Sequence, residues 1–168
     1  MGEVNPDKSV RFVLNGQSLE VPQEKTILQV ARDNGCTIPT LCYRDGCRPD
    51  GNCRACVVEI ENERVLAPSC RRTVSEAMVV WTDSERVQKS RDTVLSLLAM
   101  EGGHAEGPTS AAVTESELSK WLDVFDIRPA GSLGRASHTA VDQSHPGFTF
   151  DASVCINCDR CVRACQEE

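Results

Sequence analysis

Residues 41–56 read LCYRDGCRPDGNCRAC, and this cysteine-rich stretch decides the fold of the first half of the chain. With one more cysteine downstream it forms a ladder with spacings of ten, two and thirteen residues, made of Cys42, Cys53, Cys56 and Cys70. Iron in an iron–sulfur cluster takes soft thiolate ligands, four per cluster, and proteins commonly supply two of them from one tight loop. The spacing therefore predicts a [2Fe–2S] site.

Other uses of these cysteines are weaker but stay open. Plant-type ligation would continue from Cys47 to a cysteine at residue 50, which is Asp50, so we interpret Cys47 as a bystander. Cys36 is expected to be a small apolar core residue. Zinc is disfavoured because zinc ribbons generally bring two Cys-x2-Cys pairs and only one is present here. A disulfide framework is the least favoured alternative.

Composition sets the broad class of the protein. The formal charge of −7 over 168 residues argues against a nucleic-acid partner, since phosphate binding requires a basic face. No apolar run approaches the roughly 20 residues that cross a bilayer, so no direct membrane insertion is expected. Ten cysteines with a polar, acidic start indicate reduced thiols kept for metal and a cytoplasmic location.

The elements around the ladder predict an α+β fold of the β-grasp type, a ferredoxin-like domain at residues 8–82. Asn15-Gly16 between two alternating stretches is a strong hairpin signal, and Thr26 is placed to cap a helix that ends before Gly35. The expected strands are 10–14, 17–21, 57–60, 64–67 and 78–82, with the helix at 27–34.

Residues 83–147 are expected to be a helical connector and linker. Ser84 would cap a helix reaching Met100, with Val87, Val94, Leu97 and Leu98 on its buried stripe. Thr114 and Glu117 form a capping box for a shorter helix, whose apolar stripe should be core and consists of Leu118, Trp121, Leu122 and Phe125. The three histidines, His104, His138 and His145, are expected in surface loops.

A second cysteine run, with spacings of two, two and three, lies in residues 148–168 and comprises Cys155, Cys158, Cys161 and Cys165. This is the bacterial-ferredoxin pattern, in which the first three cysteines hold one [4Fe–4S] cluster and the fourth ligates another. We expect a partial [4Fe–4S] module, in a chain truncated before its partner run. A single cluster held by all four cysteines stays an alternative.

Several residues near the ladder are candidates for tuning the cluster. Thiolates and sulfides make a [2Fe–2S] site anionic, so nearby cations and backbone N–H groups should raise its reduction potential. The candidates are Arg44, Arg48, Arg54, Arg71 and Arg72, with Gly46, Gly51 and Ala55 leaving room for N–H groups. The alternative is that the arginines are solvated loop charges, and for Arg48 and Arg72 this alternative has the same weight as a tuning role. No phosphate loop, dinucleotide fingerprint or nucleophile motif is present, so no catalytic residue is assigned.

The ladder, with its lead-in Ile38-Pro39-Thr40-Leu41-Cys42, resembles the N-terminal [2Fe–2S] domain of three related groups. These are the large iron–sulfur subunit of respiratory complex I, the iron-only hydrogenases, and the cytosolic NAD-dependent formate dehydrogenases. In that superfamily each of the four cysteines is a cluster ligand. Cys165 favours the last two groups, and the run from Cys158 to Cys165 most resembles a formate dehydrogenase alpha subunit.

That resemblance implies an iron–sulfur segment of a multi-centre oxidoreductase that oxidises formate to carbon dioxide. A downstream domain would hold a molybdenum or tungsten pterin, and a partner iron–sulfur subunit would hold FMN and NAD. The alternatives are a hydrogenase or complex I-like segment, a free-standing carrier, and a zinc-binding interaction module. One departure stands out: the usual His-x3-Cys-x2-Cys-x5-Cys site is missing after His104, so that cluster should be absent.

Overall fold

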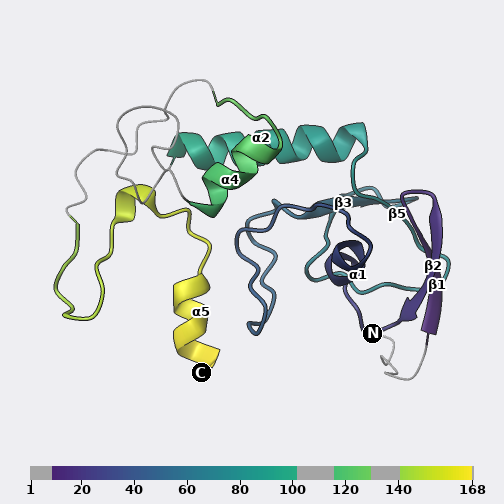
Figure 1. Cartoon of the computed structure of the whole chain (residues 1–168), viewed down its shortest axis with the longest axis horizontal. Coiled ribbons are helices and arrows are strands. Elements are labelled where there is room, and N and C mark those ends of the chain that lie inside the picture. The colour runs from purple at the N-terminus through teal and green to yellow at the C-terminus, as the bar shows by residue number, and fades with distance from the viewer. Residues whose placement is uncertain (1–8, 102–115, 130–140, 168) are drawn as a thin grey trace. The chain divides into compact units, whose positions relative to one another are not determined.

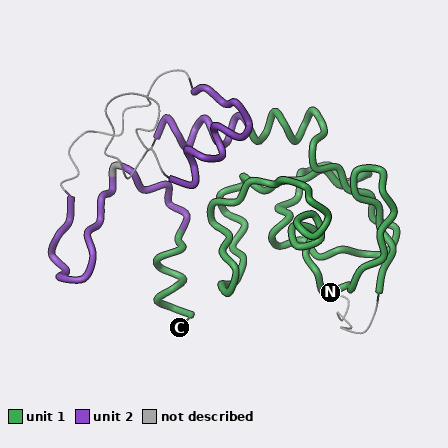
Figure 2. The backbone as a smooth tube through the Cα atoms, viewed as in Figure 1, with its two compact units in different colours: residues 1–91, 159–168 green, residues 92–158 purple. Residues whose placement is uncertain are grey.

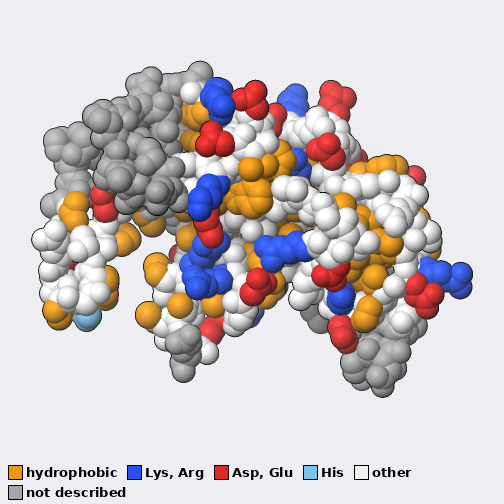
Figure 3. Space-filling model, in the orientation of Figure 1, with side chains coloured by type: hydrophobic (Ala, Val, Ile, Leu, Met, Phe, Trp, Pro, Cys, Tyr) orange, Lys and Arg blue, Asp and Glu red, His pale blue; other side chains and the backbone are white. Residues whose placement is uncertain are grey.

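The computed structural model describes residues 9–101, 116–129 and 141–167 (Figure 1). It has two compact units, one made of residues 1–91 with 159–168 and the other of residues 92–158 (Figure 2). Acidic and basic side chains are interspersed on the face that Figure 3 shows. The net charge of −7 therefore does not come from one acidic block on that face. No helix in the described ranges has both the length and the apolar character needed to span a bilayer.

The first unit opens with the predicted hairpin of β1 (Ser9–Leu14) and β2 (Gln17–Pro22). The strands are antiparallel, and Leu14 faces Gln17 across a two-residue turn. Asn15 and Gly16 both have positive φ, 51° and 83°. This pair of left-handed residues matches the right-handed twist of the strands, which is why the Asn-Gly signal located the turn correctly.

Helix α1 (Ile27–Asp33) follows and packs its apolar face into the core. Thr26 caps it reciprocally: the Gln29 N–H donates to Thr26 Oγ1 at 3.2 Å, and the Thr26 N–H donates to Gln29 Oε1 at 2.9 Å. Gly35, with φ of 72°, lies just beyond the helix end, where a left-handed residue is favoured. The predicted start of this helix is confirmed, and it ends at Asp33, one residue before the predicted end, with Asn34 as its C-cap.

The sheet has five strands in the order β2-β1-β5-β3-β4. The remaining strands are β3 (Val57–Ile60), β4 (Ala67–Pro68) and β5 (Val79–Trp81). Strand β5 lies parallel to β1 and antiparallel to β3. Buried residues of the sheet and of α1 share one core cluster, so the predicted α+β arrangement is confirmed.

The predicted strand at 64–67 is wrong over most of its length. The chain leaves β3 at a turn containing Asn62, whose φ is 64°, and only Ala67 and Pro68 return to pair with Val58 and Val57. Val65 is 67% exposed and makes no ladder pair. The prediction failed because Val65 is apolar and β-branched, which is typical of strand residues, although it lies on a loop.

Helix α2 (Glu85–Glu101) confirms the long connector helix but corrects its buried stripe. Val87, Arg91, Leu95 and Ala99 are the buried positions, whereas Leu97 is 47% exposed. Arg91 occupies a core position because its guanidinium donates to the Thr82 carbonyl at 2.8 Å. A buried charge is tolerated when such hydrogen bonds satisfy it. Hydrophobic periodicity does not predict a buried arginine, because it assigns core positions to apolar residues only.

The second unit contains α4 (Glu117–Val124), the short 3₁₀ turn η1 (Ala152–Val154) and the remaining connector. Ser116, and not Thr114, is the N-cap: its Oγ accepts from the Ser119 N–H at 3.1 Å. Thr114 lies outside the described residues. Leu118 and Leu122 are buried as expected, and Trp121 stacks on Phe125 with ring centroids 6.0 Å apart.

His145 is the one predicted loop histidine that falls within the described residues. It is exposed and stacks on Phe148 at 4.4 Å, and its Nδ1 accepts from the Gly147 N–H at 3.1 Å. The expectation of a surface residue is confirmed. His104 and His138 lie outside the described residues.

Replacing the cap residue Thr26 with alanine should lower the free energy of unfolding by about 1 kcal/mol, because the Gln29 N–H loses its acceptor. Urea unfolding followed by circular dichroism measures this. Thr37→Ala is the matched control, since Thr37 lies after the helix and should change stability by less than about 0.5 kcal/mol. Equal losses in both variants would contradict the capping role.

Glu59 on β3 ties the sheet to the start of α2, because its carboxylate accepts from Ser84 Oγ at 2.5 Å and from Arg86 Nη1 at 2.6 Å. These two donors, the hydroxyl first, lower the pKa of Glu59 from its usual value. Between the lowered pKa and the usual one, the unfolded state therefore binds more protons at this carboxyl than the folded state does. The stabilisation is present above the usual glutamate pKa and is lost as the pH falls through the lowered value.

We therefore expect Glu59→Gln to lower stability at neutral pH by about 0.5–1 kcal/mol, the size of a well-formed surface ion pair. The difference from the unsubstituted chain should shrink as the pH falls below 4.5, the usual value for the carboxyl. Denaturant titrations at several pH values test this, with the exposed Glu61→Gln as control. A difference that is unchanged in acid would refute the role given to the carboxylate.

Candidate metal centre

The loop that follows α1 and leads into β3 carries the first three cysteines of the ladder. It contains no regular strand or helix, yet Leu41, Cys42 and Ala55 are at most 1% exposed. Its residues with left-handed φ include Gly46 at 87°, Gly51 at 74° and Arg54 at 58°. A Cβ at Gly51 would also meet Arg71 Cδ at 3.0 Å, so both the left-handed φ and the close side chain favour glycine there. The loop is folded tightly around its cysteines.

The structure brings the four cysteines of the ladder together as two pairs. Cys42 and Cys53 form one pair, with their thiols hydrogen-bonded and the Cys42 N–H donating to Cys53 Sγ at 3.4 Å. Cys56 and Cys70 form the other through a hydrogen bond between their thiols. The turn carrying Cys70 is held by α1, whose Leu28 N–H donates to the Ser69 carbonyl at 3.0 Å.

In the first pair the two thiols differ sharply in acidity. The hydrogen bond from the Cys53 thiol, helped by backbone N–H groups including that of Gly51, lowers the pKa of Cys42 to about 5 despite its burial. The same hydrogen bond, followed by burial, raises the pKa of Cys53. The hydrogen bond therefore favours the thiolate form of Cys42 and keeps the proton on Cys53.

The second pair repeats this arrangement. The Cys70 thiol donates to Cys56 and lowers the pKa of Cys56 to about 7, while the pKa of Cys70 is raised, first by that hydrogen bond and then by burial. A thiol must lose its proton to ligate a metal. Each pair therefore offers one thiol that ionises readily and one whose proton leaves as the metal binds.

These residues fit a [2Fe–2S] cluster. Two pairs of soft donors match two irons, because each iron takes two thiolates in addition to the bridging sulfides. Backbone N–H groups of Gly51 and Asn52 donate to Cys42 sulfur, which suits an anionic cluster. Within the described residues, no three His, Cys, Asp or Glu side chains are grouped so as to hold a single metal ion.

The second cysteine run is divided between the two units. Cys161 and Cys165 lie one turn apart on α5 (Arg160–Glu167), in the first unit, and both are exposed. Cys155 and Cys158 belong to the second unit and are half-buried. Asn157 and Asp159 have φ of 52° and 56°, so the backbone turns sharply through the run. The [4Fe–4S] assignment of these four cysteines stays a prediction.

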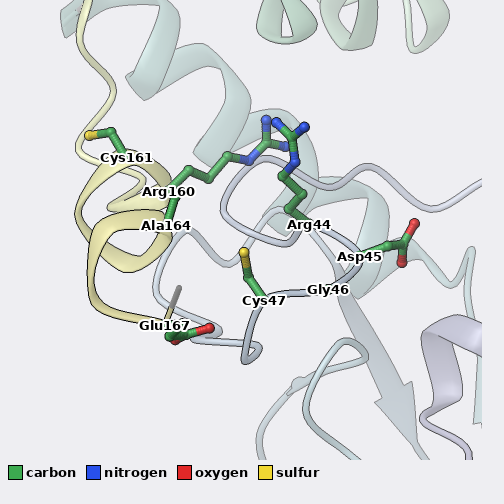
Figure 4. A pocket seen from close by; sticks show the side chains of 8 residues that line it. All are labelled: Arg44, Asp45, Gly46, Cys47, Arg160, Cys161, Ala164 and Glu167. Atoms are coloured by element: carbon green, nitrogen blue, oxygen red, sulfur yellow. The ribbon is translucent and has the colours of Figure 1, made fainter.

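The two cysteines interpreted as bystanders make contacts of their own. Cys36 is half-buried against the core and accepts a hydrogen bond from Asn15 Nδ2 at 3.6 Å. Cys47 lines a pocket of about 640 Å³ between the loop and α5, together with Arg44, Arg160 and Glu167 (Figure 4). Neither thiol has a hydrogen bond to the four paired cysteines among the contacts of the described residues.

The candidate tuning arginines have different roles. Arg71 donates to the Asp50 carbonyl at 3.3 Å and so supports the cysteine loop. Arg72 is engaged in an ion pair with Glu63 at 2.6 Å, and Arg48 in one with Glu167 at 3.6 Å. Arg44 is exposed. Sequence reasoning missed Arg160 and Arg163, which reach the loop from α5, because their distance along the chain gave no signal.

Comparison with known proteins agrees with this geometry. Residues 7–85 match the family model described as "2Fe-2S iron-sulfur cluster binding domain". Over 161 residues the chain is 38% identical to the NADP-reducing hydrogenase subunit HndD of Solidesulfovibrio fructosivorans, covering 92% of this chain and 27% of that protein. Over 156 residues it is 33% identical to the mitochondrial NADH-ubiquinone oxidoreductase 78 kDa subunit of Candida albicans, covering 92% of this chain and 22% of that protein.

A solved structure is also similar along most of the chain. It is described as an NAD+-reducing [NiFe]-hydrogenase in the H2-reduced state, with 28% identity and a TM-score of 0.82, covering 95% of this chain and 67% of that one. The chain thus spans only about a quarter of these two curated relatives. Residues 7–85 are thus similar to a 2Fe-2S iron–sulfur cluster binding domain, and the chain resembles the 78 kDa subunit of NADH-ubiquinone oxidoreductase and the HndD hydrogenase subunit over 92% of its length.

Proposed function

We propose that this chain is an electron-relay segment of a multi-centre oxidoreductase, with a [2Fe–2S] cluster ligated by Cys42, Cys53, Cys56 and Cys70. The observation that carries the proposal is the arrangement of these cysteines as two hydrogen-bonded, largely buried pairs inside the matched domain. When bound, such a cluster accepts and releases one electron. Nothing in the segment is assigned to convert a substrate.

The residues around the pairs would set how readily that electron is held. Burial of Cys42, Cys56 and Cys70 excludes water from the sulfurs, which disfavours added negative charge. Two sets of hydrogen bonds hold the ligands in place: backbone N–H groups donate to the Cys42 sulfur, and Ser69 Oγ donates to the Cys56 carbonyl at 2.7 Å. The N–H groups also favour the reduced state of the cluster. The protein's contribution would be spacing and potential tuning.

For the second run we propose that Cys155, Cys158 and Cys161 bind a [4Fe–4S] cluster and that Cys165 serves a second one. The spacing of two, two and three supports this, as does the exposure of Cys161 and Cys165, which leaves both sulfurs accessible to a cluster held partly by other residues. The proposed partners are a downstream catalytic domain and a subunit carrying FMN and NAD, in the cytoplasm.

The relatives reported above favour a hydrogenase or complex I-like enzyme over the formate dehydrogenase that the tail of the sequence resembles. We therefore propose electron exchange with a nicotinamide-linked enzyme of that kind as the first choice. A formate dehydrogenase with a molybdenum or tungsten pterin is the second, carried by the run from Cys158 to Cys165. A free-standing carrier would need no catalytic domain.

Anaerobic reductive titration followed by electron paramagnetic resonance tests the relay. A reversible signal should appear on reduction with dithionite and vanish on reoxidation, whereas a zinc-bound chain would take up no electrons and would refute the proposal. The enzyme assembled around this chain then distinguishes the substrates. Hydrogen should generate the signal in a hydrogenase and formate in a formate dehydrogenase, whereas a complex I-like enzyme should respond to NADH and to neither of these two substrates.

A further inference from the structure

Helix α5, which carries half of the second cysteine run, is anchored on the loop of the first cysteine ladder. Arg160 Nη2 donates to the Tyr43 carbonyl at 3.1 Å, and Asn52 Nδ2 donates to Asp159 Oδ2 at 3.3 Å. Glu167, at the other end of the helix, accepts from the Arg48 N–H at 2.8 Å. Figure 4 shows Arg160 extending from α5 toward the loop. These contacts span the whole helix.

The central contact comes from Arg163, which lies between Cys161 and Cys165 in the sequence. It is 3% exposed, although both cysteines and Val162 beside it are exposed. Its Nη2 donates a short hydrogen bond to the carbonyl of Cys42, and its Nη1 donates to the carbonyl of Arg48 at 2.5 Å. One planar guanidinium thus bridges the two ends of the 42–48 segment.

The Arg163 contact has two effects: it fixes the positions of two carbonyl groups, and it places a positive charge beside Cys42. A guanidinium is fixed in a fork geometry, so one Arg163 side chain can hold two carbonyls at a set separation, which a lysine cannot do. It is also a cation buried against the peptide of Cys42, where Coulomb interactions are screened less than at the surface. A cation held next to a cluster ligand favours the reduced, more negative state of the cluster.

We propose that Arg163 is a positioning residue through which the second cysteine run raises the reduction potential of the [2Fe–2S] site. The proposal rests on the function proposed above. It differs from the expectation for the loop arginines, since the residue comes from the other cysteine motif. Folding of α5 onto the loop places its charge at Cys42, so the potential of one site depends on the other being correctly folded.

Redox titration of the full chain, followed through the signal of the reduced [2Fe–2S] site, tests this with three variants. Arg163→Gln removes the charge and the fork. Arg163→Lys keeps the charge but loses the fork. Arg44→Gln removes one charge from the same loop at an exposed position and is the matched control.

At the midpoint potential of the unsubstituted chain, Arg163→Gln should lower the ratio of reduced to oxidised cluster at least tenfold, or about 59 mV for one electron. Arg163→Lys should lower it about two- to fivefold, and Arg44→Gln less than about threefold. The proposal is overturned if Arg163→Gln stays within threefold, or if Arg163→Lys loses as much as Arg163→Gln. If Arg163→Gln does not fold, a shift in Arg163→Lys no larger than in Arg44→Gln overturns it. A missing signal in the unsubstituted chain would instead refute the function proposed above.

Discussion

The Cys53→Ser variant should lose the signal of the reduced [2Fe–2S] cluster and most of the iron bound at that site. Cys53 is the hydrogen-bonded partner of Cys42, and serine offers a harder oxygen donor whose proton is much more difficult to remove. One pair would then present a single thiolate to its iron. Iron and sulfide analysis with electron paramagnetic resonance of the reduced chain measures the loss.

Cys47→Ser is the control for that experiment. Cys47 lies in the same loop, between two proposed ligands, but it lines the pocket beside α5 instead of joining either pair. We expect the variant to keep its cluster and its signal. Loss of the signal in both variants would show that the ligand set is wrong.

The second large effect is expected in the core beneath the site. Leu28 is 0% exposed on α1, and its N–H holds the carbonyl of Ser69, the residue before Cys70. Leu28→Ala should lower the free energy of unfolding by about 2–5 kcal/mol, since it leaves a cavity that rigid neighbours fill only in part. The loosened helix should also let the chain lose iron faster to a chelator.

Val65→Ala provides the comparison for that variant. Val65 is 67% exposed on the loop before β4, so its truncation should change stability by about 0.5 kcal/mol or less and leave iron loss unchanged. Urea unfolding and chelator kinetics give the two readouts. If Leu28→Ala destabilised the chain no more than Val65→Ala, α1 would not support the site as described.

Local chemistry explains which parts of the fold could be predicted. The turn at Asn15-Gly16 and the cap at Thr26 depend on neighbours two or three residues away, so the sequence pattern located both correctly. The strand expected at 64–67 failed because pairing with β3 is decided across the sheet. There the turn at Asn62 delays the return of the chain until Ala67.

The candidate site shows the same division. Cysteine spacing indicated which thiols come together, because soft-ligand chemistry restricts the loop between Cys53 and Cys56. The spacing did not predict how they pair, nor the buried Arg163 at the Cys42 carbonyl, because that contact joins residues 121 positions apart. Arg91 was missed for a related reason, since a hydrogen-bonded charge can occupy a core position that hydrophobic periodicity assigns to apolar residues.

The most direct test of the central claim is the metal content of the full chain in which Cys155 and Cys158 are replaced by serine. This variant disables the second run and leaves the ladder intact. We predict about two irons and two acid-labile sulfides per chain, with a paramagnetic signal that appears on reduction. Zinc without iron, or iron without sulfide, would contradict the assignment of a [2Fe–2S] cluster to Cys42, Cys53, Cys56 and Cys70.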